Sequence, residues 1–153
     1  MDEKKLKILH ETGHYLSVPK GISMKPMLKS GSNVVDIVPA TSDLKKYDVA
    51  LYWRETDKSC VLHRVLDVKD DHYIFYGDNC FQKEIVSKDD IIGVAAQFYR
   101  NGKWISVNNT KYMLYVHLWC DFLPLRCFIF RIRDAFKSKF RKLKNDNQNN
   151  QAI

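Results

Sequence analysis

The feature that most constrains how this chain folds is a series of seven short segments with β-strand patterning between residues 15 and 107. Branched aliphatic and aromatic residues are concentrated in these segments, and polar turn sequences separate them. The segments are residues 15–20, 33–38, 48–53, 60–68, 72–76, 91–99 and 103–107. Short strands that are joined by turns pair most readily as antiparallel neighbours. The sequence therefore predicts a mainly β fold, built as a coiled antiparallel sheet or half-barrel.

Two local signals mark the ends of elements in this region. Asn101-Gly102 lies between the last two predicted strands, and this dipeptide is typical of a two-residue hairpin turn. Residues 4–10 are predicted to form a short helix that ends near Gly13, because glycine commonly follows the last turn of a helix. The helix and the seven strands make up the first predicted domain, residues 1–108.

The hydrophobic pattern changes after residues 108–110. Beyond them apolar residues recur at steps of three and four, which places them in one stripe along a helix. The stripe consists of Leu125, Phe128, Ile129, Ile132, Phe136, Phe140 and Leu143. Pro124 is expected to begin this helix or to separate it from a preceding one at residues 112–123. Residues 109–144 are thus predicted to form a basic amphipathic helical tail, and the Asn- and Gln-rich residues 145–153 to be disordered.

The positive charge of the chain lies in this tail. The formal net charge is +7, and residues 100–153 carry 11 of the 25 basic side chains but three of the 18 acidic ones. A basic amphipathic helix is typical of a segment that binds an anionic membrane surface or a partner protein. The alternative is that the apolar stripe packs on the β domain. Nucleic acid is not expected as a partner, because no aromatic–basic stacking pattern or recognition motif accompanies the charge.

The sequence favours a cytoplasmic location, peripheral at the inner face of the membrane. Residues 1–9 contain no apolar signal-peptide core, and the most apolar stretch, residues 113–130, is interrupted by Asp121 and Arg126. The cysteines form no C-x-x-C pair, so we expect reduced thiols rather than disulfides or zinc ligands. They are Cys60, Cys80, Cys120 and Cys127. No cofactor or metal site is predicted.

Three short motifs contain residues capable of chemistry. Ser23 lies in Gly-Ile-Ser-Met-Lys-Pro-Met-Leu, between a predicted strand and a proline-marked turn. His63 lies in Val-Leu-His-Arg-Val-Leu, on the apolar face of a predicted strand, and Asp78 lies in Tyr-Gly-Asp-Asn-Cys, where a strand ends in a turn. Each motif alone is commonplace, because serine and aspartate are frequent turn residues and a histidine on an apolar face usually belongs to the core.

In this order and spacing, however, the three motifs resemble type I signal peptidases, which share a superfamily with the self-cleaving SOS-repressor domains. The resemblance rests on Ser-Met-x-Pro-x-Leu from Ser23, on His63 followed by arginine, and on Gly-Asp-Asn around Asp78. It covers about residues 15–99 and implies the fold of that family, and we expect a form without the family's N-terminal membrane anchor. The implied function is that of a serine endopeptidase that cleaves an extended peptide or protein substrate.

The resemblance also implies a role for each site residue. Ser23 matches the nucleophile, and His63 matches the base of the family's serine–histidine branch. A histidine suits this task because it is largely neutral near pH 7 and can take the proton of a hydroxyl. That branch places an acid a few residues beyond Gly-Asp-Asn, which points to Glu84, five positions after Asn79, as the group that orients the base. Asp78 is the other candidate for that role, or a structural turn residue.

Substrate is expected to bind as an added strand along residues 15–22, which lead directly into the nucleophile. Gly21, Ile22 and Met24 are therefore predicted to be substrate-binding residues. Gly21 stands where bacterial lysine-type enzymes have a serine or threonine that helps to form the oxyanion hole. This departure favours an alternative function, a non-catalytic peptide-binding module on the same fold.

Overall fold

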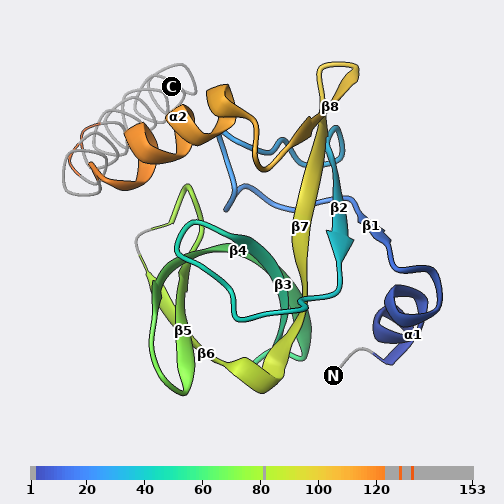
Figure 1. The fold of residues 1–153 in the computed structure, drawn as a ribbon. Coiled ribbons are helices and arrows are strands. Elements are labelled where there is room, and N and C mark those ends of the chain that lie inside the picture. The colour runs from blue at the N-terminus through green and yellow to red at the C-terminus, as the bar shows by residue number, and fades with distance from the viewer. Residues whose placement is uncertain (1–2, 81, 123–127, 129–131, 133–153) are drawn as a thin grey trace, which may run out of the picture. The chain divides into compact units, whose positions relative to one another are not determined.

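The computed structural model confirms a mainly β fold, an open antiparallel sheet of eight strands in the order β1-β2-β7-β3-β4-β5-β6 with β8 paired to β7 (Figure 1). It describes residues 3–80, 82–122, 128 and 132. The strands are β1 (Tyr15–Ser17), β2 (Val34–Val38), β3 (Val49–Arg54), β4 (Ser59–Val68), β5 (His72–Tyr76), β6 (Lys83–Ser87), β7 (Ile91–Arg100) and β8 (Lys103–Ser106). The helices are α1 (Glu3–Thr12) and α2 (Thr110–Cys120), with a short 3-10 turn, η1 (Lys88–Asp90), before β7.

Each of the seven predicted segments overlaps a strand, but the sequence pattern did not reveal β6. Among the described residues this strand pairs with β5 alone, and its exposed positions include Lys83, Ile85 and Ser87. Because only Val86 of β6 is fully buried, the strand lacks the apolar alternation that marks the others. Its formation depends on pairing with β5 and not on a strand pattern of its own.

Strands β3 to β6 curl around a core of apolar side chains, and this curvature is plain in Figure 1. Within this core the ring centroids of Tyr52 and Phe75 lie 4.7 Å apart. Its buried members are Leu44, Ala50, Tyr52, Val61, Val65, Tyr73, Phe75 and Val86. Full burial of each large apolar side chain contributes about 1.5–3 kcal/mol, so this cluster is a major source of the domain's stability.

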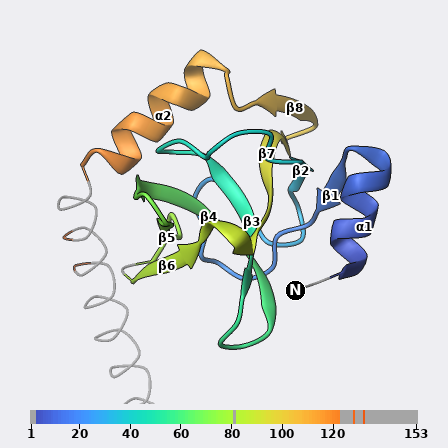
Figure 2. The same ribbon diagram turned by 60° about the horizontal axis from the view of Figure 1, so that its bottom comes forward.

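Helix α1 lies beside β1 (Figure 2) and packs against β7 through Leu9. Leu9 is buried, and a β-carbon at Gly93 of β7 would lie 3.0 Å from its Cδ2 atom. The helix ends where predicted, because Gly13 has a φ of +75° and its N–H donates a 2.9 Å hydrogen bond to the Leu9 carbonyl. The predicted hairpin turn at Asn101-Gly102 is also present, with φ angles of +49° and +81° that this turn requires.

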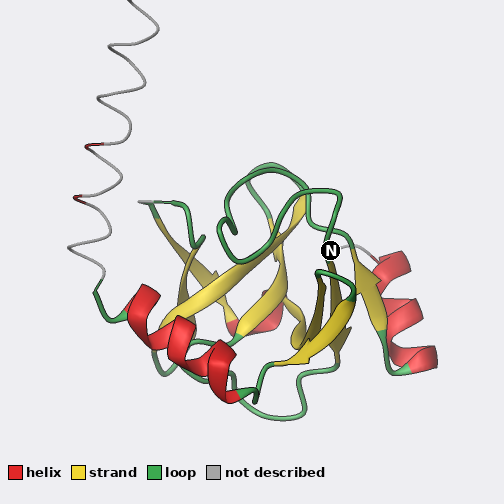
Figure 3. Ribbon diagram, turned by 90° about the horizontal axis from the view of Figure 1, so that it is seen from above, coloured by secondary structure: helices red, strands yellow, loops and turns green. Residues whose placement is uncertain are grey.

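Helix α2 belongs to the same compact unit as the sheet, which comprises Met1–Cys120 (Figure 3). The side chain of Asn109 caps the helix, since its Oδ1 accepts hydrogen bonds from the N–H groups of Lys111 and Tyr112 at 3.0 and 3.2 Å. Tyr112 and Val116 are buried against the strands. The compact unit therefore includes α2, and one face of this helix completes the core.

The second compact unit, Asp121–Ile153, falls mostly outside the described residues. The residues that the structure does not describe include Pro124, Cys127 and all of 145–153. Of the predicted stripe only Phe128 and Ile132 are described. The amphipathic tail beyond α2 accordingly stays a prediction. In the part of the chain that the structure describes, no helix combines the length and apolar character needed to cross a bilayer.

Candidate active site

Ser23 lies in a turn-rich loop that follows β1 and is anchored by buried side chains on its far side. Met24, Met27 and Leu28 are each no more than 4% exposed, and the Leu28 N–H donates a 2.8 Å hydrogen bond to the Met24 carbonyl. Ser23 itself is half-buried. The sequence thus fixes this loop by burying the methionines and the leucine of the motif while its serine stays accessible.

The Gly-Asp-Asn turn holds the Ser23 loop from a distant part of the chain. The backbone N–H of Asn79 donates a 2.6 Å hydrogen bond to the Ser23 carbonyl, and its side-chain amide donates a 3.2 Å bond to the Ile22 carbonyl. Gly77 allows this close approach, since a β-carbon there would lie 2.7 Å from the Ser23 carbonyl oxygen and 3.1 Å from Nε2 of His63. The structure therefore brings all three predicted motifs together.

His63 lies on β4, only 5% exposed, with its Nδ1 atom facing an acidic and a phenolic side chain. This nitrogen is 3.2 Å from Oε1 of Glu84 and 3.2 Å from the hydroxyl oxygen of Tyr52. The Tyr52 hydroxyl donates its own proton to Glu84 at 2.8 Å, so both groups can only accept from His63. We therefore assign the proton of the neutral imidazole to Nδ1, which leaves Nε2 as a base.

Glu84, on β6, is held as a carboxylate by the groups around it. The hydrogen bond from His63 is the main cause that lowers the pKa of Glu84 to about 2, with further contributions from Tyr52 and Arg54. Arg54 Nη1 lies 3.3 Å from both carboxylate oxygens. Burial and the adjacent Glu84 raise the pKa of the Tyr52 phenol, so the hydroxyl stays a hydrogen-bond donor. This arrangement orients the imidazole and stabilises a positive charge on it.

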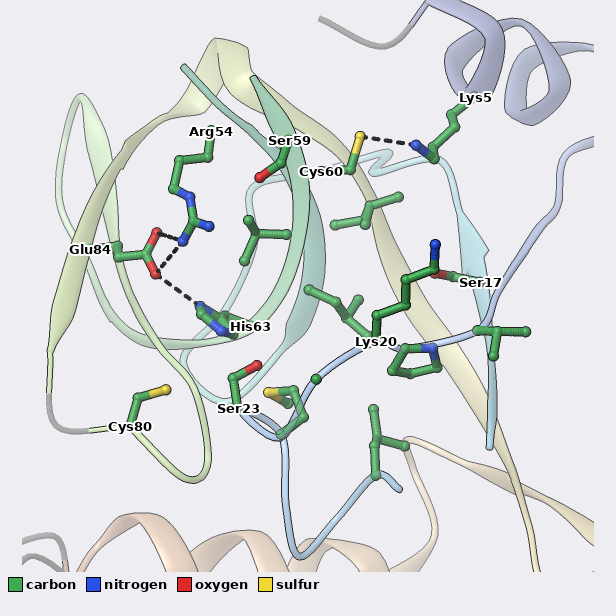
Figure 4. A pocket seen from close by; sticks show the side chains of 18 of the residues that line it. Lys5, Ser17, Lys20, Ser23, Arg54, Ser59, Cys60, His63, Cys80 and Glu84 are labelled. Carbon is green, nitrogen blue, oxygen red and sulfur yellow. Dashed lines mark hydrogen bonds and ion pairs between the residues drawn. The ribbon is translucent and has the colours of Figure 1, made fainter. Parts of the chain in front are cut away.

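Figure 4 shows Ser23 beside His63 at one end of a pocket of about 900 Å³ that both residues line. Within the described residues no hydrogen bond joins the Ser23 hydroxyl to the imidazole, and the Ser23 N–H donates to no other group. Catalytic hydrogen bonds are often long without substrate and tighten when it binds. The free N–H is of the kind that forms an oxyanion hole.

Asp78 has a different position from the one that an orienting acid would need. It forms a bidentate ion pair with Arg64, with two contacts of 2.8 Å, and both side chains are fully buried. Tyr115 and Trp119 of α2 donate hydrogen bonds to its carboxylate and its carbonyl, at 3.3 and 3.0 Å. Of the two candidates for the orienting acid, the geometry thus favours Glu84. Asp78 instead accepts hydrogen bonds that connect α2 to the Gly-Asp-Asn turn.

Of the three predicted substrate-binding residues, two line the pocket and one does not. Gly21 and Met24 line the pocket, whereas Ile22 is 60% exposed and lies outside its lining. The Ile22 carbonyl instead accepts hydrogen bonds from Lys25 and Asn79, which makes it part of the loop's framework. Gly21 has a φ of +80°, a left-handed conformation that favours glycine over the serine or threonine of the lysine-type enzymes.

Sequence reasoning missed Tyr52 and Arg54, which both hold Glu84 from β3. Their spacing of two residues on a strand places them on one face, but nothing in the sequence indicates which strand they would meet. Within the described residues Cys60, Cys80 and Cys120 form no disulfide, and Cys127 lies outside those residues. The described residues contain no cluster of three or more potential metal ligands.

Comparison with known proteins identifies no relative: no family model, no curated protein and no solved structure matches this chain.

Proposed function

We propose that this protein is a serine endopeptidase of the signal-peptidase-like type, with Ser23 as nucleophile, His63 as general base and Glu84 as the residue that orients the base. The observation that carries the proposal is the 3.2 Å approach of Glu84 Oε1 to His63 Nδ1. It leaves Nε2 unprotonated next to the Gly77 turn, to which the Ser23 loop is bonded. A nucleophile, a base and an orienting acid in this order form the arrangement that activates a serine hydroxyl.

In the proposed reaction, Nε2 of His63 takes the proton of the Ser23 hydroxyl while its oxygen attacks the peptide carbonyl carbon. Glu84 stabilises the imidazolium that forms, and the Ser23 N–H donates to the developing oxyanion. The imidazolium then gives its proton to the leaving amine, and water hydrolyses the acyl-enzyme by the same steps. Because Gly21 has no side-chain donor, the oxyanion hole lacks one contact, which costs roughly 10²–10³ in rate where such a donor is removed.

The substrate is proposed to be an extended peptide that adds to the sheet next to β1. This strand is at the end of the strand order and pairs with β2 through Tyr15, Leu16 and Ser17. The pocket lies between the segment that follows β1 and strand β4, so a peptide that extends the sheet would pass Ser23 and His63. Backbone pairing supplies affinity in this mode, and pockets for alternate side chains supply specificity.

The direct test is fluorophosphonate labelling and peptide cleavage by the wild type and by Ser23→Ala. We expect Ser23→Ala to lose both signals, and Ser30→Ala, which changes an exposed serine outside the pocket, to keep both. Equal signals from the wild type and Ser23→Ala would remove Ser23 from the mechanism.

The alternative, a non-catalytic peptide-binding module, is favoured by the absence of a donor at Gly21. It predicts peptide binding without turnover and unchanged affinity in His63→Ala.

We also propose a peripheral location at an anionic membrane surface, on the cytoplasmic side. Leu114 and Leu118 lie one helical turn apart on α2 and are 62% and 59% exposed. The chain that follows α2 carries most of the excess positive charge. Exposed leucines beside a basic segment are typical of helices that lie in the interface of an anionic bilayer, where each basic residue contributes about 1 kcal/mol.

A further inference from the structure

The pocket that contains Ser23 and His63 extends to a second, basic end. Figure 4 shows the ammonium groups of Lys5 and Lys20 directed into this part of the pocket, near Ser17 and Cys60. Lys5 comes from α1, and its Nζ atom donates a 3.3 Å hydrogen bond to the Cys60 thiol on β4. Lys20 comes from the segment between β1 and the nucleophile loop. Two cations from separate elements therefore line the same end of the pocket.

The charges of this end are not balanced within the pocket. Among the described lining residues the basic side chains are Lys5, Lys20 and Arg54, and the carboxylate is Glu84. Glu84 is already bonded to His63, Tyr52 and Arg54. Lys20 forms no ion pair and donates no side-chain hydrogen bond within the described residues. A ligand that enters this end would therefore meet the ammonium group of Lys20, which no carboxylate pairs within the described residues.

The distance from the reacting groups sets the position that such a ligand would occupy. Cys60, whose thiol accepts the hydrogen bond from Lys5, precedes His63 by three residues on strand β4, and Lys20 lines the same end of the pocket from the segment that leads to Ser23. Three residues of extended chain span about 10 Å. An extended peptide that runs alongside β4 would place the side chain of its third residue from the scissile bond next to the two ammonium groups.

We infer that the Lys5–Lys20 end of the pocket binds an acidic side chain of the substrate, about three residues from the bond that is cleaved. The inference rests on the proposed peptidase function and names its substrate class, a peptide with an aspartate or glutamate at that position. The two cations would select the substrate by charge, whereas Ser23 and His63 act on the peptide bond. Selection and chemistry can therefore be tested separately.

The experiment uses the full chain and a library of extended peptides in which every position is varied, with cleavage products read by mass spectrometry. The wild type should enrich aspartate and glutamate about three residues from the cut. Lys20→Gln and the double variant Lys5→Gln/Lys20→Gln should reduce this enrichment about three- to tenfold, as expected for partly exposed charge pairs. Lys5→Glu/Lys20→Glu should enrich lysine and arginine instead. Lys29→Gln, which removes an exposed charge outside the pocket, should leave the preference unchanged.

Failure of the inference is distinguishable from failure of the proposed function. Cleavage that depends on Ser23 but shows no acidic preference overturns the inference and leaves the peptidase standing. If the wild type cleaves nothing, the peptidase fails, and retention of the same library on immobilised Ser23→Ala protein decides the inference. Preferential retention of acidic peptides that is lost in Lys5→Gln/Lys20→Gln on the Ser23→Ala background supports it. Equal retention of acidic and neutral peptides, or none of either, overturns it.

Discussion

Glu84, on the edge strand β6, places its Oε1 atom 3.2 Å from Nδ1 of His63 on β4, although β5 lies between these strands in the sheet. The curvature of β3 to β6 around their apolar core brings the two side chains together. On a flat sheet, strands with one neighbour between them are about 10 Å apart. The proposed base and its orienting acid therefore depend on the curl of the sheet.

Replacement of the acid should affect catalysis strongly. Glu84→Gln keeps the size of the side chain, but its amide can donate to Nδ1 and so stabilise the tautomer that has no base at Nε2. We expect kcat for peptide cleavage to fall about 10²- to 10⁴-fold with little change in KM. Glu11→Gln, on the exposed face of α1, is the control. Unchanged kcat in Glu84→Gln would exclude an orienting role for this residue.

The same variant gives a prediction of stability against pH. The pKa of Glu84 lies at about 2 in the folded chain, below its ordinary value of 4.5. A lowered folded-state pKa contributes stability that is fully present above pH 4.5 and is lost as pH falls towards 2. The difference in unfolding free energy between wild type and Glu84→Gln, measured with urea, should therefore shrink as pH is lowered from 5. A difference that is constant with pH would contradict this.

Tyr52→Phe tests whether the phenol positions the catalytic pair. The change removes the hydroxyl that lies 3.2 Å from His63 and donates to Glu84, but keeps the ring that packs on Phe75. We expect kcat to fall roughly tenfold, while stability changes by about 1 kcal/mol, the usual contribution of one hydrogen bond. Tyr73→Phe is the matched control, because the Tyr73 hydroxyl accepts a 3.1 Å hydrogen bond from the Leu44 N–H in the same core. Equal kcat losses in both variants would indicate a structural effect only.

Gly77→Ala should impair the site through crowding. The new β-carbon would meet the Ser23 carbonyl oxygen at 2.7 Å, the Cys80 thiol at 2.8 Å and His63 Nε2 at 3.1 Å, so the nucleophile loop or the imidazole must move. A shift of about 1 Å at reacting groups costs on the order of 10²-fold in rate. We expect at least that loss of cleavage, with the chain still folded by circular dichroism. Full activity in Gly77→Ala would show that the Ser23 loop and the His63 side chain have room for an added β-carbon, and would contradict the expected crowding.

Arg64→Met should destabilise the whole compact unit. It leaves Asp78 buried without its partner, and breaking a fully buried ion pair in this way typically costs about 3–5 kcal/mol. Chemical denaturation should show this loss, and Arg64→Met/Asp78→Leu should recover part of it. Lys7→Gln, which removes one partner of an exposed pair on α1, should cost less than about 1 kcal/mol. Similar losses in Arg64→Met and Lys7→Gln would contradict the structural role of the buried pair.

Leu114→Gln/Leu118→Gln tests the membrane proposal on the full chain. We expect the wild type to float with vesicles of phosphatidylcholine and phosphatidylserine, and less with phosphatidylcholine alone or at high salt. The double variant should float several-fold less, because two exposed leucines no longer enter the interface. Ile85→Gln changes another exposed apolar residue, on β6, and should float like wild type. Equal flotation of wild type and the double variant would discard α2 as the contact.

Seven of the eight strands, the hairpin turn, the end of α1 and the segments that contain Ser23 and His63 could be predicted from the sequence. These features depend on interactions between near neighbours: alternation along a strand, and backbone conformations that glycine and asparagine permit at Gly13 and Asn101. Strand β6 was missed for the same reason, since its pairing with β5 supplies what its own residues lack. Patterns within a short segment indicate its own conformational preference but not the strand with which it pairs.

The pairing of the acid with the base could not be predicted from the sequence and follows from the folded structure. Asp78 and Glu84 are both acids near one turn, yet the first is buried against Arg64 and the second reaches His63 with the help of Tyr52 and Arg54. That choice depends on the curl of the sheet and on the docking of α2, which join residues far apart in the chain. The periodicity of the sequence does not predict the contact between Glu84 and His63, because the interactions that stabilise this contact form only after the strands have paired.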